Sequence, residues 1–213
     1  MIKKNNFPIK IPIFPLSNAI FFPKTILPLN IFEDRYIQLV NDSMKESRMF
    51  GMVQPKNKLS KLPEVYDVGC LGKIISFNET NDKRFIISLS GIIRFRIKKE
   101  FEKEKLYRNF EVDYSEFLTD LEETKDEIAS YDKKNLQNKI KTFFQKINYP
   151  IDYNELEKLS LDQIVGTVAM ISPFSVEEKQ KLIETKKIED KIKILDEIIS
   201  FNLLDFEKNK TVQ

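Results

Sequence analysis

Prolines interrupt a strongly apolar stretch near the N-terminus, and this feature limits the fold of the chain more than any other. The stretch covers residues 11–36, and its four prolines are Pro12, Pro15, Pro23 and Pro28. Each proline lacks an amide donor and disfavours helix at the residue before it. The stretch therefore cannot be one buried helix or one central strand with an unbroken ladder. We expect short extended segments and turns, anchored to a core by apolar side chains: Phe14, Leu16, Phe21, Phe22, Leu27, Leu29, Ile31 and Phe32.

A helix is expected directly after this stretch. Asn30 is a candidate N-cap, and Glu33 three residues later completes a capping-box pattern. Apolar residues then recur at helical spacing as far as Met44. The pattern predicts one helix from Asn30 to about Met44.

Strand patterns follow between residues 48 and 114. A short strand is predicted over residues 48–53, and a lysine-rich polar loop follows it at residues 55–63. Residues 65–97 predict a hairpin whose polar turn lies at residues 78–83, with Gly91 marking a bulge or sharp bend.

Charged residues alternate with apolar ones at the end of this region. Arg94 and Arg96 alternate with Ile93, Phe95 and Ile97, so we expect one buried face and one cationic face. A similar alternation over residues 110–114 adds a further strand. The first lobe, residues 1–117, is thus predicted to be a partly closed, mostly antiparallel β-barrel with one helix.

The second lobe is predicted to be α-helical. An acidic joint at residues 118–127 precedes apolar stripes at helical spacing, and the first stripe ends before Pro150. Two capping boxes open helices further on: Ser160 with Gln163, and Ser175 with Glu178. The lobe at residues 118–213 is therefore expected to be a helical bundle, and the fold class is α+β.

The sequence lacks the residue patterns of the common catalytic and metal-binding sites. The chain has no histidine, which excludes Ser-His-Asp and Cys-His arrangements and histidine-bearing zinc sites. Cys70, the single cysteine, lies in a strand pattern and is expected to be a buried thiol. Residues 69–73 lack the spacer of a phosphate-binding P-loop. We expect no catalytic residue, no cofactor and no metal.

The cellular setting is predicted from what the chain lacks. No window approaches the roughly 20 apolar residues of a membrane span, and the N-terminus has no apolar segment typical of a signal peptide. One cysteine excludes an internal disulfide framework. The expected location is cytoplasmic, without membrane association, and the oligomeric state is left open.

Several motifs in order resemble one protein family. The motifs are Ile13-Phe14-Pro15-Leu16, Phe22-Pro23, residues 27–33, Arg35-Tyr36, residues 66–70, residues 90–96 and residues 171–180. Together they resemble the N-terminal, substrate-binding domain of Lon proteases, in particular its stand-alone bacterial members, over about residues 9–204. The resemblance implies a PUA-like pseudo-barrel followed by a helical bundle. Complete Lon proteases continue into an ATPase module and a Ser-Lys peptidase domain, so the resemblance carries no catalytic activity to these residues.

The leading functional hypothesis is a non-catalytic module that binds polypeptide. The resemblance implies contact with unfolded or damaged protein, and aromatic residues beside extended backbone suit strand addition and apolar pockets. The candidate residues are Phe21, Phe22, Phe32, Arg35 and Tyr36. The competing interpretation is that these aromatic side chains are core, where large apolar residues usually lie. A related hypothesis is an adaptor that docks onto a separate ATP-dependent protease.

RNA binding is the alternative hypothesis. Residues 1–115 carry 20 Lys and Arg against 13 Asp and Glu, whereas the remainder is acidic. PUA-like barrels are also used for RNA, and the candidate residues here are Lys56, Lys58, Lys61, Arg94 and Arg96. Against it, the sequence shows no row of aromatic residues among the basic ones on which bases would stack.

Overall fold

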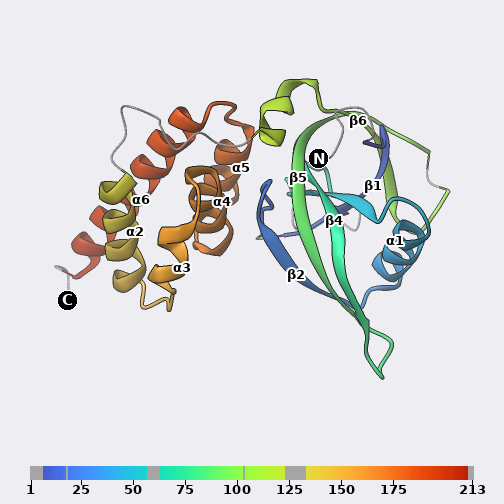
Figure 1. Ribbon diagram of the computed structural model, residues 1–213, viewed down its shortest axis with the longest axis horizontal. Helices are drawn as coiled ribbons and strands as arrows, with labels where there is room; N and C mark the ends of the chain where they lie inside the picture. The colour runs from blue at the N-terminus through green and yellow to red at the C-terminus, as the bar shows by residue number, and fades with distance from the viewer. Residues whose placement is uncertain (1–6, 18, 57–62, 103, 123–132, 211–213) are drawn as a thin grey trace. The chain divides into compact units, whose positions relative to one another are not determined.

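The computed structural model describes residues 7–17, 19–56, 63–102, 104–122 and 133–210, with side chains as far as residue 204 (Figure 1). The chain divides into two compact units, Met1–Glu123 and Thr124–Gln213, which are described separately below. The expected division lay at residue 117. The difference arises because the 3₁₀ helix η1 (Ser115–Leu121) packs on strand β5 of unit 1.

Unit 1 is built on a single six-stranded sheet. Its strands are β1 (Lys10–Pro15), β2 (Ile26–Ile31), β3 (Met49–Val53), β4 (Val68–Glu79), β5 (Phe85–Glu100) and β6 (Arg108–Asp113). They follow the order β2-β5-β4-β3-β1-β6, and β6 also pairs with β5. This extra pairing closes the sheet into a pseudo-barrel, with β2 added at one side. The α+β class is confirmed, but the sheet is mixed, because β1 and β3 run parallel while the other pairs are antiparallel.

The proline-rich stretch forms β1, a loop and β2. Pro12 lies in β1 opposite Asn109 of β6, and Pro15 ends the strand. Most of the anchoring side chains are buried as expected: Phe14, Phe21, Phe22, Leu29 and Ile31. Phe32 is the clear exception, with 63% of its surface exposed. The stretch is therefore short extended segments and turns, as the prolines predict.

Helix α1 (Asp34–Lys45) begins later than the sequence pattern predicts. Its N-cap is Glu33, whose backbone carbonyl accepts from the amides of Tyr36 and Ile37 at 2.8 and 2.9 Å. Asn30, the expected cap, instead lies in β2 opposite Ile86 of β5. The prediction of an Asn30 cap is wrong because Leu29 and Ile31, on either side of Asn30, pair with β5 and keep the chain extended as far as Ile31.

A bulge at Gly91 bends the long hairpin of β4 and β5. Leu71 pairs with Ile93 and Gly72 with Gly91, so β5 carries one extra residue between the two pairs. The loop before β2 closes on this point: Gly91 N–H donates to the Thr25 carbonyl, and Lys24 N–H donates to the Gly91 carbonyl, both at 2.9 Å. The predicted bulge is confirmed. Figure 1 shows the turn of this hairpin projecting beyond the rest of unit 1.

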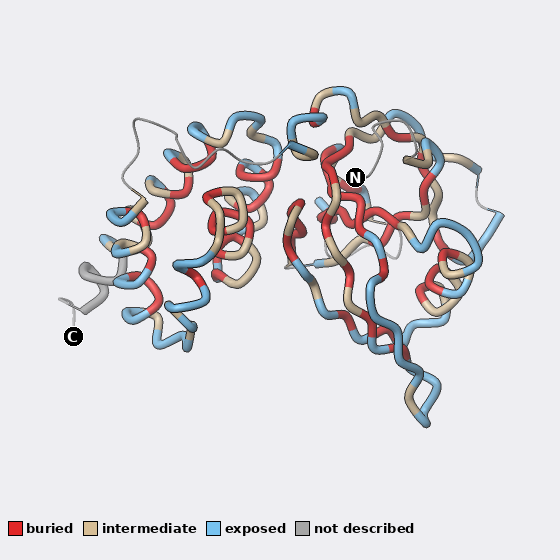
Figure 2. Tube along the Cα trace, viewed as in Figure 1, coloured by how far each residue is buried: buried red, intermediate tan, exposed pale blue. Residues whose placement is uncertain are grey.

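Unit 2 is helical in its described residues. Its helices are α2 (Lys133–Lys146), α3 (Tyr153–Lys158), α4 (Leu161–Ile171), α5 (Val176–Glu184) and α6 (Ile188–Lys210). Both predicted capping boxes are present, at the starts of α4 and α5. Helix α6 contacts α2, α4 and α5, and these helices turn their buried residues toward one another (Figure 2). The apolar stripe predicted to end before Pro150 starts with Ile128 and Tyr131, and these two residues lie outside the described residues.

Candidate functional site

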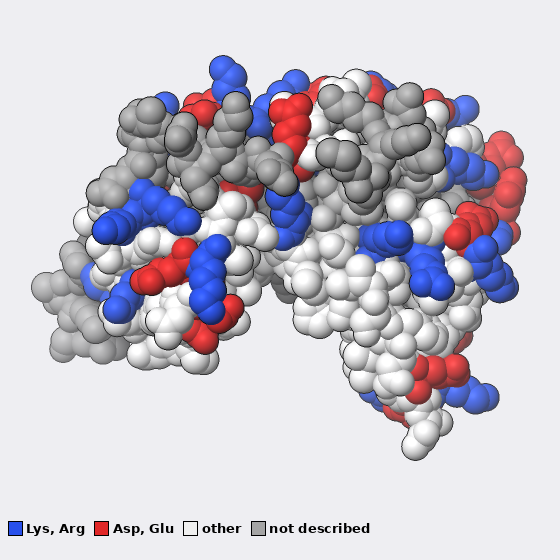
Figure 3. Space-filling model, in the orientation of Figure 1, with Lys and Arg blue, Asp and Glu red and all other residues white. Residues whose placement is uncertain are grey.

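Three neighbouring strands of unit 1 expose apolar side chains on the face turned away from the core. Antiparallel sheets usually place polar residues on such a face. Here, what we call the outer face of β2, β5 and β4 carries five exposed apolar residues: Ile26, Pro28, Phe32, Ile75 and Ile86. Around these strands much of the surface visible in Figure 3 is uncharged. The outer face is the candidate site because exposed apolar surface on a sheet commonly marks a partner site.

The strand register places these side chains on one surface. Ile26 lies opposite Ser90, Pro28 opposite Ser88, and Asn30 opposite Ile86. Directly opposed residues on an antiparallel pair point to the same side, and alternate residues along a strand do so too. A bulge in β4 between Ile74 and Ser76 leaves Ile75 as an extra residue, which is 55% exposed. The result is a stripe of aliphatic and aromatic groups separated by serine and asparagine, with the exposed Lys73 opposite Ser90 at one end.

Strand β2 also lies at the edge of the sheet, and within the described residues it pairs only with β5. The Thr25 carbonyl accepts from Gly91 of β5. Because backbone groups two residues apart point the same way, those of residues 27, 29 and 31 also face β5. Ile26, Pro28 and Asn30 therefore direct their backbone groups away from the sheet. Pro28 sits where no ladder bond of the sheet needs its missing donor, as expected for proline on an edge strand.

Charged groups lie at the end of β2. The Arg84 guanidinium lies 6.0 Å from the centre of the Phe32 ring. Arg35 makes an ion pair with Glu33 at 2.7 Å and lies over the ring of Tyr36 at 4.5 Å. These contacts give the apolar outer face a polar border. A bound chain would therefore meet an aromatic side chain flanked by cations that can also contact its carbonyl groups.

The five polypeptide-binding candidates separate by burial. Phe32 and Arg35 are accessible, whereas Phe21, Phe22 and Tyr36 are core residues with 2, 3 and 6% of their surface exposed. Tyr36 stacks on Phe14 with ring centres 4.0 Å apart, and its burial raises the pKa of its hydroxyl. The proposal that these three side chains contact a client is therefore not supported, and the competing interpretation of core residues holds for them. The loop before β2 folds Phe21 and Phe22 inward, and α1 packs Tyr36 against β1.

Sequence reasoning missed Ile26, Ile75 and Ile86. The alternation of Ile26, Pro28 and Asn30 along β2, continued by Phe32 directly after it, was a usable signal, since the buried Leu29 and Ile31 lie between them. Ile75 and Ile86 could not be found in this way, because each stands next to another isoleucine and only the register decides which one faces outward.

The RNA candidates within the described residues, Lys56, Arg94 and Arg96, each pair with a carboxylate and do not form a cationic face. Arg94 is 1% exposed and pairs with Asp120 of η1 at 2.8 Å, while Arg96 pairs with Glu116 at 2.6 Å. The Lys56 ammonium pairs with Glu64, and that hydrogen bond raises the pKa of the lysine. Lys58 and Lys61 lie outside the described residues. The expected cationic face of β5 is thus corrected, because η1 covers it and supplies a carboxylate to each arginine.

Within the described residues, no cluster of three or more cysteine and carboxylate side chains is arranged to hold a metal ion. No helix there combines the length and the hydropathy needed to cross a bilayer.

The fold and sequence have clear relatives. The family model of the "ATP-dependent protease La (LON) substrate-binding domain" matches residues 10–200. Lon protease 2 of Myxococcus xanthus is 25% identical over 205 residues, which cover 94% of this chain and 24% of that protein. Lon protease of Desulfosudis oleivorans is 26% identical over 200 residues, covering 89% of this chain and 23% of that protein.

Solved structures share the fold. The N-terminal domain of Mycobacterium avium complex Lon protease aligns with a TM-score of 0.63 at 16% identity, covering 90% of this chain and 98% of that domain. The Lon N-terminal domain protein from Xanthomonas campestris aligns with a TM-score of 0.61 at 21% identity, covering 87% of this chain and 96% of that one.

These matches define the class as a Lon-type N-terminal fold. The chain belongs to the Lon substrate-binding domain family. It spans about a quarter of the length of the full-length relatives described above, 24% in the first of them. The match is to the substrate-binding domain and not to the catalytic domains.

Proposed function

We propose that this chain is a non-catalytic module that binds non-native polypeptide on the outer face of β2, β5 and β4. Membership of the Lon substrate-binding domain family supports a substrate-binding role. The observation that carries the proposal is the exposed apolar outer face itself. Unfolded chains expose apolar side chains that a native protein buries, so this surface favours the unfolded form.

The energetics suit weak, sequence-tolerant capture. Full burial of one Phe or Ile side chain contributes about 1.5–3 kcal/mol. Phe32 and Ile86 are 63 and 48% exposed, so covering both recovers a large part of that gain. Serine and asparagine between them provide hydrogen-bonding groups without fixing a particular client side chain. The outer face therefore selects for apolar content more than for sequence.

The open edge of β2 would add backbone contacts. An extended segment lying along this edge meets the amides of Ile26 and Asn30 and the carbonyls of residues 26, 28 and 30. Pro28 has no backbone N–H, so the middle of this edge lacks a donor. This limits strand addition by a client and protects the edge from aggregation with other strands. Side chains on the outer face would then supply most of the affinity, and the edge would align the bound segment.

A titration with a paired substitution tests the proposal. The client is a reduced and alkylated globular protein, compared with its native form by fluorescence anisotropy. We expect the wild-type chain to bind only the unfolded form. Phe32→Ser with Ile86→Thr should weaken this binding at least about tenfold, because losing roughly 1.4 kcal/mol of apolar burial has that effect.

The control removes an exposed aromatic residue elsewhere. Phe201 on α6 is 67% exposed, so Phe201→Ser deletes a similar apolar surface without touching the outer face. Its binding should stay within about twofold of wild type, since it loses no contact with the client. Equal loss in both variants, or equal binding of native and unfolded client by the wild type, would exclude the outer face as the site.

Pro28 offers a separate test of the edge. Pro28→Val restores an outward-facing N–H and suits a strand. We expect client binding to tighten by about two- to fivefold, the worth of one net hydrogen bond, and self-association to rise in sedimentation velocity. Unchanged affinity and unchanged sedimentation would show that the edge of β2 takes no part.

Further parts of the proposal rest on the family. Association with a separate ATP-dependent protease, as an adaptor, and a cytoplasmic location are consistent with it and need partner capture and fractionation to test. The RNA alternative is not favoured, because Arg94 and Arg96 are engaged with Asp120 and Glu116. A gel-shift titration at low salt, where phosphate contacts are strongest, would reveal any RNA binding.

A further inference from the structure

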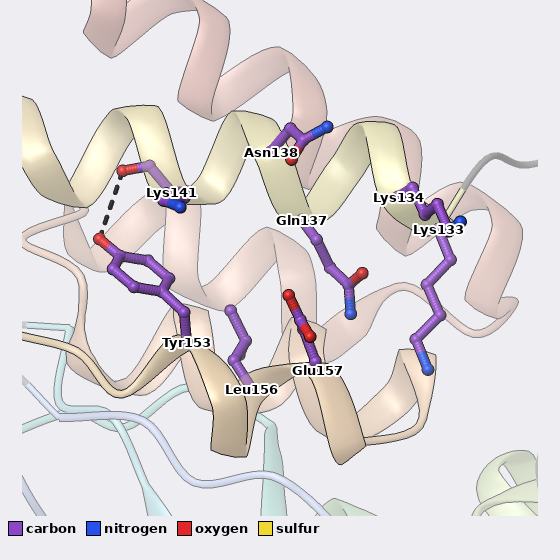
Figure 4. Close-up of a pocket in the computed structure, with 8 residues that line it drawn as sticks. All are labelled: Lys133, Lys134, Gln137, Asn138, Lys141, Tyr153, Leu156 and Glu157. Carbon is purple, nitrogen blue, oxygen red and sulfur yellow. Dashed lines mark hydrogen bonds between the residues drawn. The ribbon is translucent and has the colours of Figure 1, made fainter.

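Unit 2 contains a polar groove between α2 and α3 that the proposed function does not use (Figure 4). Its volume is about 490 Å³, within the range of small-molecule sites. Lys133 reaches from α2 across toward α3, Gln137 and Glu157 face one another, and Tyr153 points up toward Lys141. Such a lining is too polar for a purely apolar ligand.

The charge of the groove is positive. Lys133, Lys134 and Lys141 line it, against one carboxylate, Glu157. Neither Lys133 nor Lys141 has a carboxylate of the described residues within ion-pair distance, unlike Lys139 on the same helix, which pairs with Asp196 at 2.6 Å. Cations that line a groove and lack an internal anion attract an anionic ligand. The eight-residue separation of Lys133 and Lys141 spans about 12 Å of helix.

The floor of the groove is different in character. Leu156 is buried there, and the Tyr153 hydroxyl donates to the backbone carbonyl of Lys141 at 3.4 Å. The Lys141 ammonium lies 5.3 Å from the centre of the Tyr153 ring. Leu156 is only 4% exposed, so the half-buried Tyr153 ring provides most of the surface that a bare inorganic anion would leave uncovered. A ligand with an organic part next to its anionic group would cover it.

We propose that the groove between α2 and α3 binds a small organic phosphate. Its phosphate group contacts Lys133, Lys141 supplies a second positive charge at the other end of the groove, and its uncharged part covers the Tyr153 ring. The Gln137 side chain provides both a donor and an acceptor for polar groups between them. This site lies within unit 2 and is independent of polypeptide capture by unit 1.

Calorimetric titration of the full chain at low ionic strength tests the proposal. The probes are adenosine diphosphate, glucose 6-phosphate, inorganic phosphate and adenosine, so that a nucleotide, a sugar phosphate, the anion alone and the organic part alone are compared. We expect saturable binding of at least one organic phosphate, at least about fivefold tighter than inorganic phosphate, with adenosine undetectable. Added salt should weaken the binding, because the charges are partly exposed.

Matched substitutions locate the site. Lys133→Gln with Lys141→Gln should weaken the tighter organic phosphate about tenfold, since two partly exposed charge contacts contribute roughly 1.4 kcal/mol together. Lys158→Gln is the control, because Lys158 lies on α3, is 68% exposed and pairs with Glu155 outside the groove. Glutamine keeps a similar helix propensity in each variant.

Three outcomes would overturn the proposal. The first is no saturable binding of either organic phosphate. The second is adenosine binding as tightly as its diphosphate, which would make the anionic group irrelevant. The third is an equal effect of Lys158→Gln and the groove variant, which would show a general attraction to the surface charge of unit 2 and no site. Circular dichroism of each variant confirms that the helices remain folded.

Discussion

Replacing Asp120 by alanine is expected to destabilise unit 1 by about 3–5 kcal/mol, the usual cost of breaking a buried ion pair from one side. Asp120 and Arg94 have 6 and 1% of their side-chain surface exposed. The aspartate accepts from the Arg94 guanidinium at 2.8 and 2.9 Å and from the Arg94 backbone amide at 3.0 Å. Without it, a buried guanidinium remains in a site that water does not reach, over the ring of Phe117.

Hydrogen exchange of peptides from β5 and η1 measures this loss in unit 1 alone. Glu116→Ala is the matched control, because Glu116 pairs with the neighbouring Arg96 but the two side chains are 27 and 35% exposed. Its cost should be about 1 kcal/mol or less. Arg94→Met combined with Asp120→Leu should recover most of the stability, since no buried charge is then left alone. Equal protection in the Asp120 and Glu116 variants would contradict the assignment.

Gly91→Ala is the second substitution with a large expected effect, about 3 kcal/mol or more of lost stability. A Cβ at Gly91 would lie 2.0 Å from the Phe22 carbonyl oxygen and 3.1 Å from the Pro23 Cα. Both are backbone atoms, so no rotamer change relieves the contact. The loop would have to move away from β5, and the two hydrogen bonds of Gly91 with Lys24 and Thr25 would be lost with it.

Gly72 provides a control at the same rung of the ladder, because it pairs with Gly91. A Cβ at Gly72 would meet side-chain atoms of Leu89 at 2.5 Å and of Phe21 at 2.7 Å. Side chains can shift, so Gly72→Ala should cost about 1–2 kcal/mol, less than the Gly91 substitution. Urea unfolding followed by circular dichroism gives the ranking. A Gly72 effect as large as that of Gly91 would mean that the loop before β2 yields easily.

The Gly91 substitution also connects stability to the proposed function. The loop at residues 22–25 leads directly into β2, which carries Ile26 and Pro28 of the outer face. Moving this loop would shift the start of the edge strand without changing any residue that faces a client. We therefore expect Gly91→Ala to weaken binding of unfolded client as well, at temperatures where the variant is still folded.

Local signals in the sequence predicted the fold well where one segment decides the structure. Prolines in an apolar run implied short segments, glycine implied a bulge, and Ser-x-x-Gln and Ser-x-x-Glu implied helix starts; each needs only its own neighbours. The prediction of a cap at Asn30 was wrong because β5 pairs with the segment that contains Asn30, and the residue opposite it, Ile86, lies 56 positions further along the chain. Propensity near a boundary yields to a ladder formed with a distant partner.

The candidate site was less predictable, for the same reason. Alternation along β5 correctly separates Arg94 from Ile93 and Phe95, but it does not say what later covers the arginine. The two carboxylates belong to η1: Asp120 lies 26 residues after Arg94, and Glu116 lies 20 residues after Arg96. Likewise Phe32 and Tyr36 look alike as aromatic residues next to a helix start. Only the packing of α1 against β1 buries Tyr36, while Phe32 stays in water.

The closure of the pseudo-barrel has a consequence for how this chain folds. Strand β1 pairs with β6 between Lys10 and Glu111, so the last rung waits for a residue made about one hundred positions later. Pairings so distant in sequence slow folding, because a long loop must close before any contact compensates its entropy. At synthesis rates of about 5–20 residues per second, β1 spends roughly 5–20 seconds without β6. During that interval its apolar residues are themselves an exposed, extended segment of the kind that the outer face is proposed to bind.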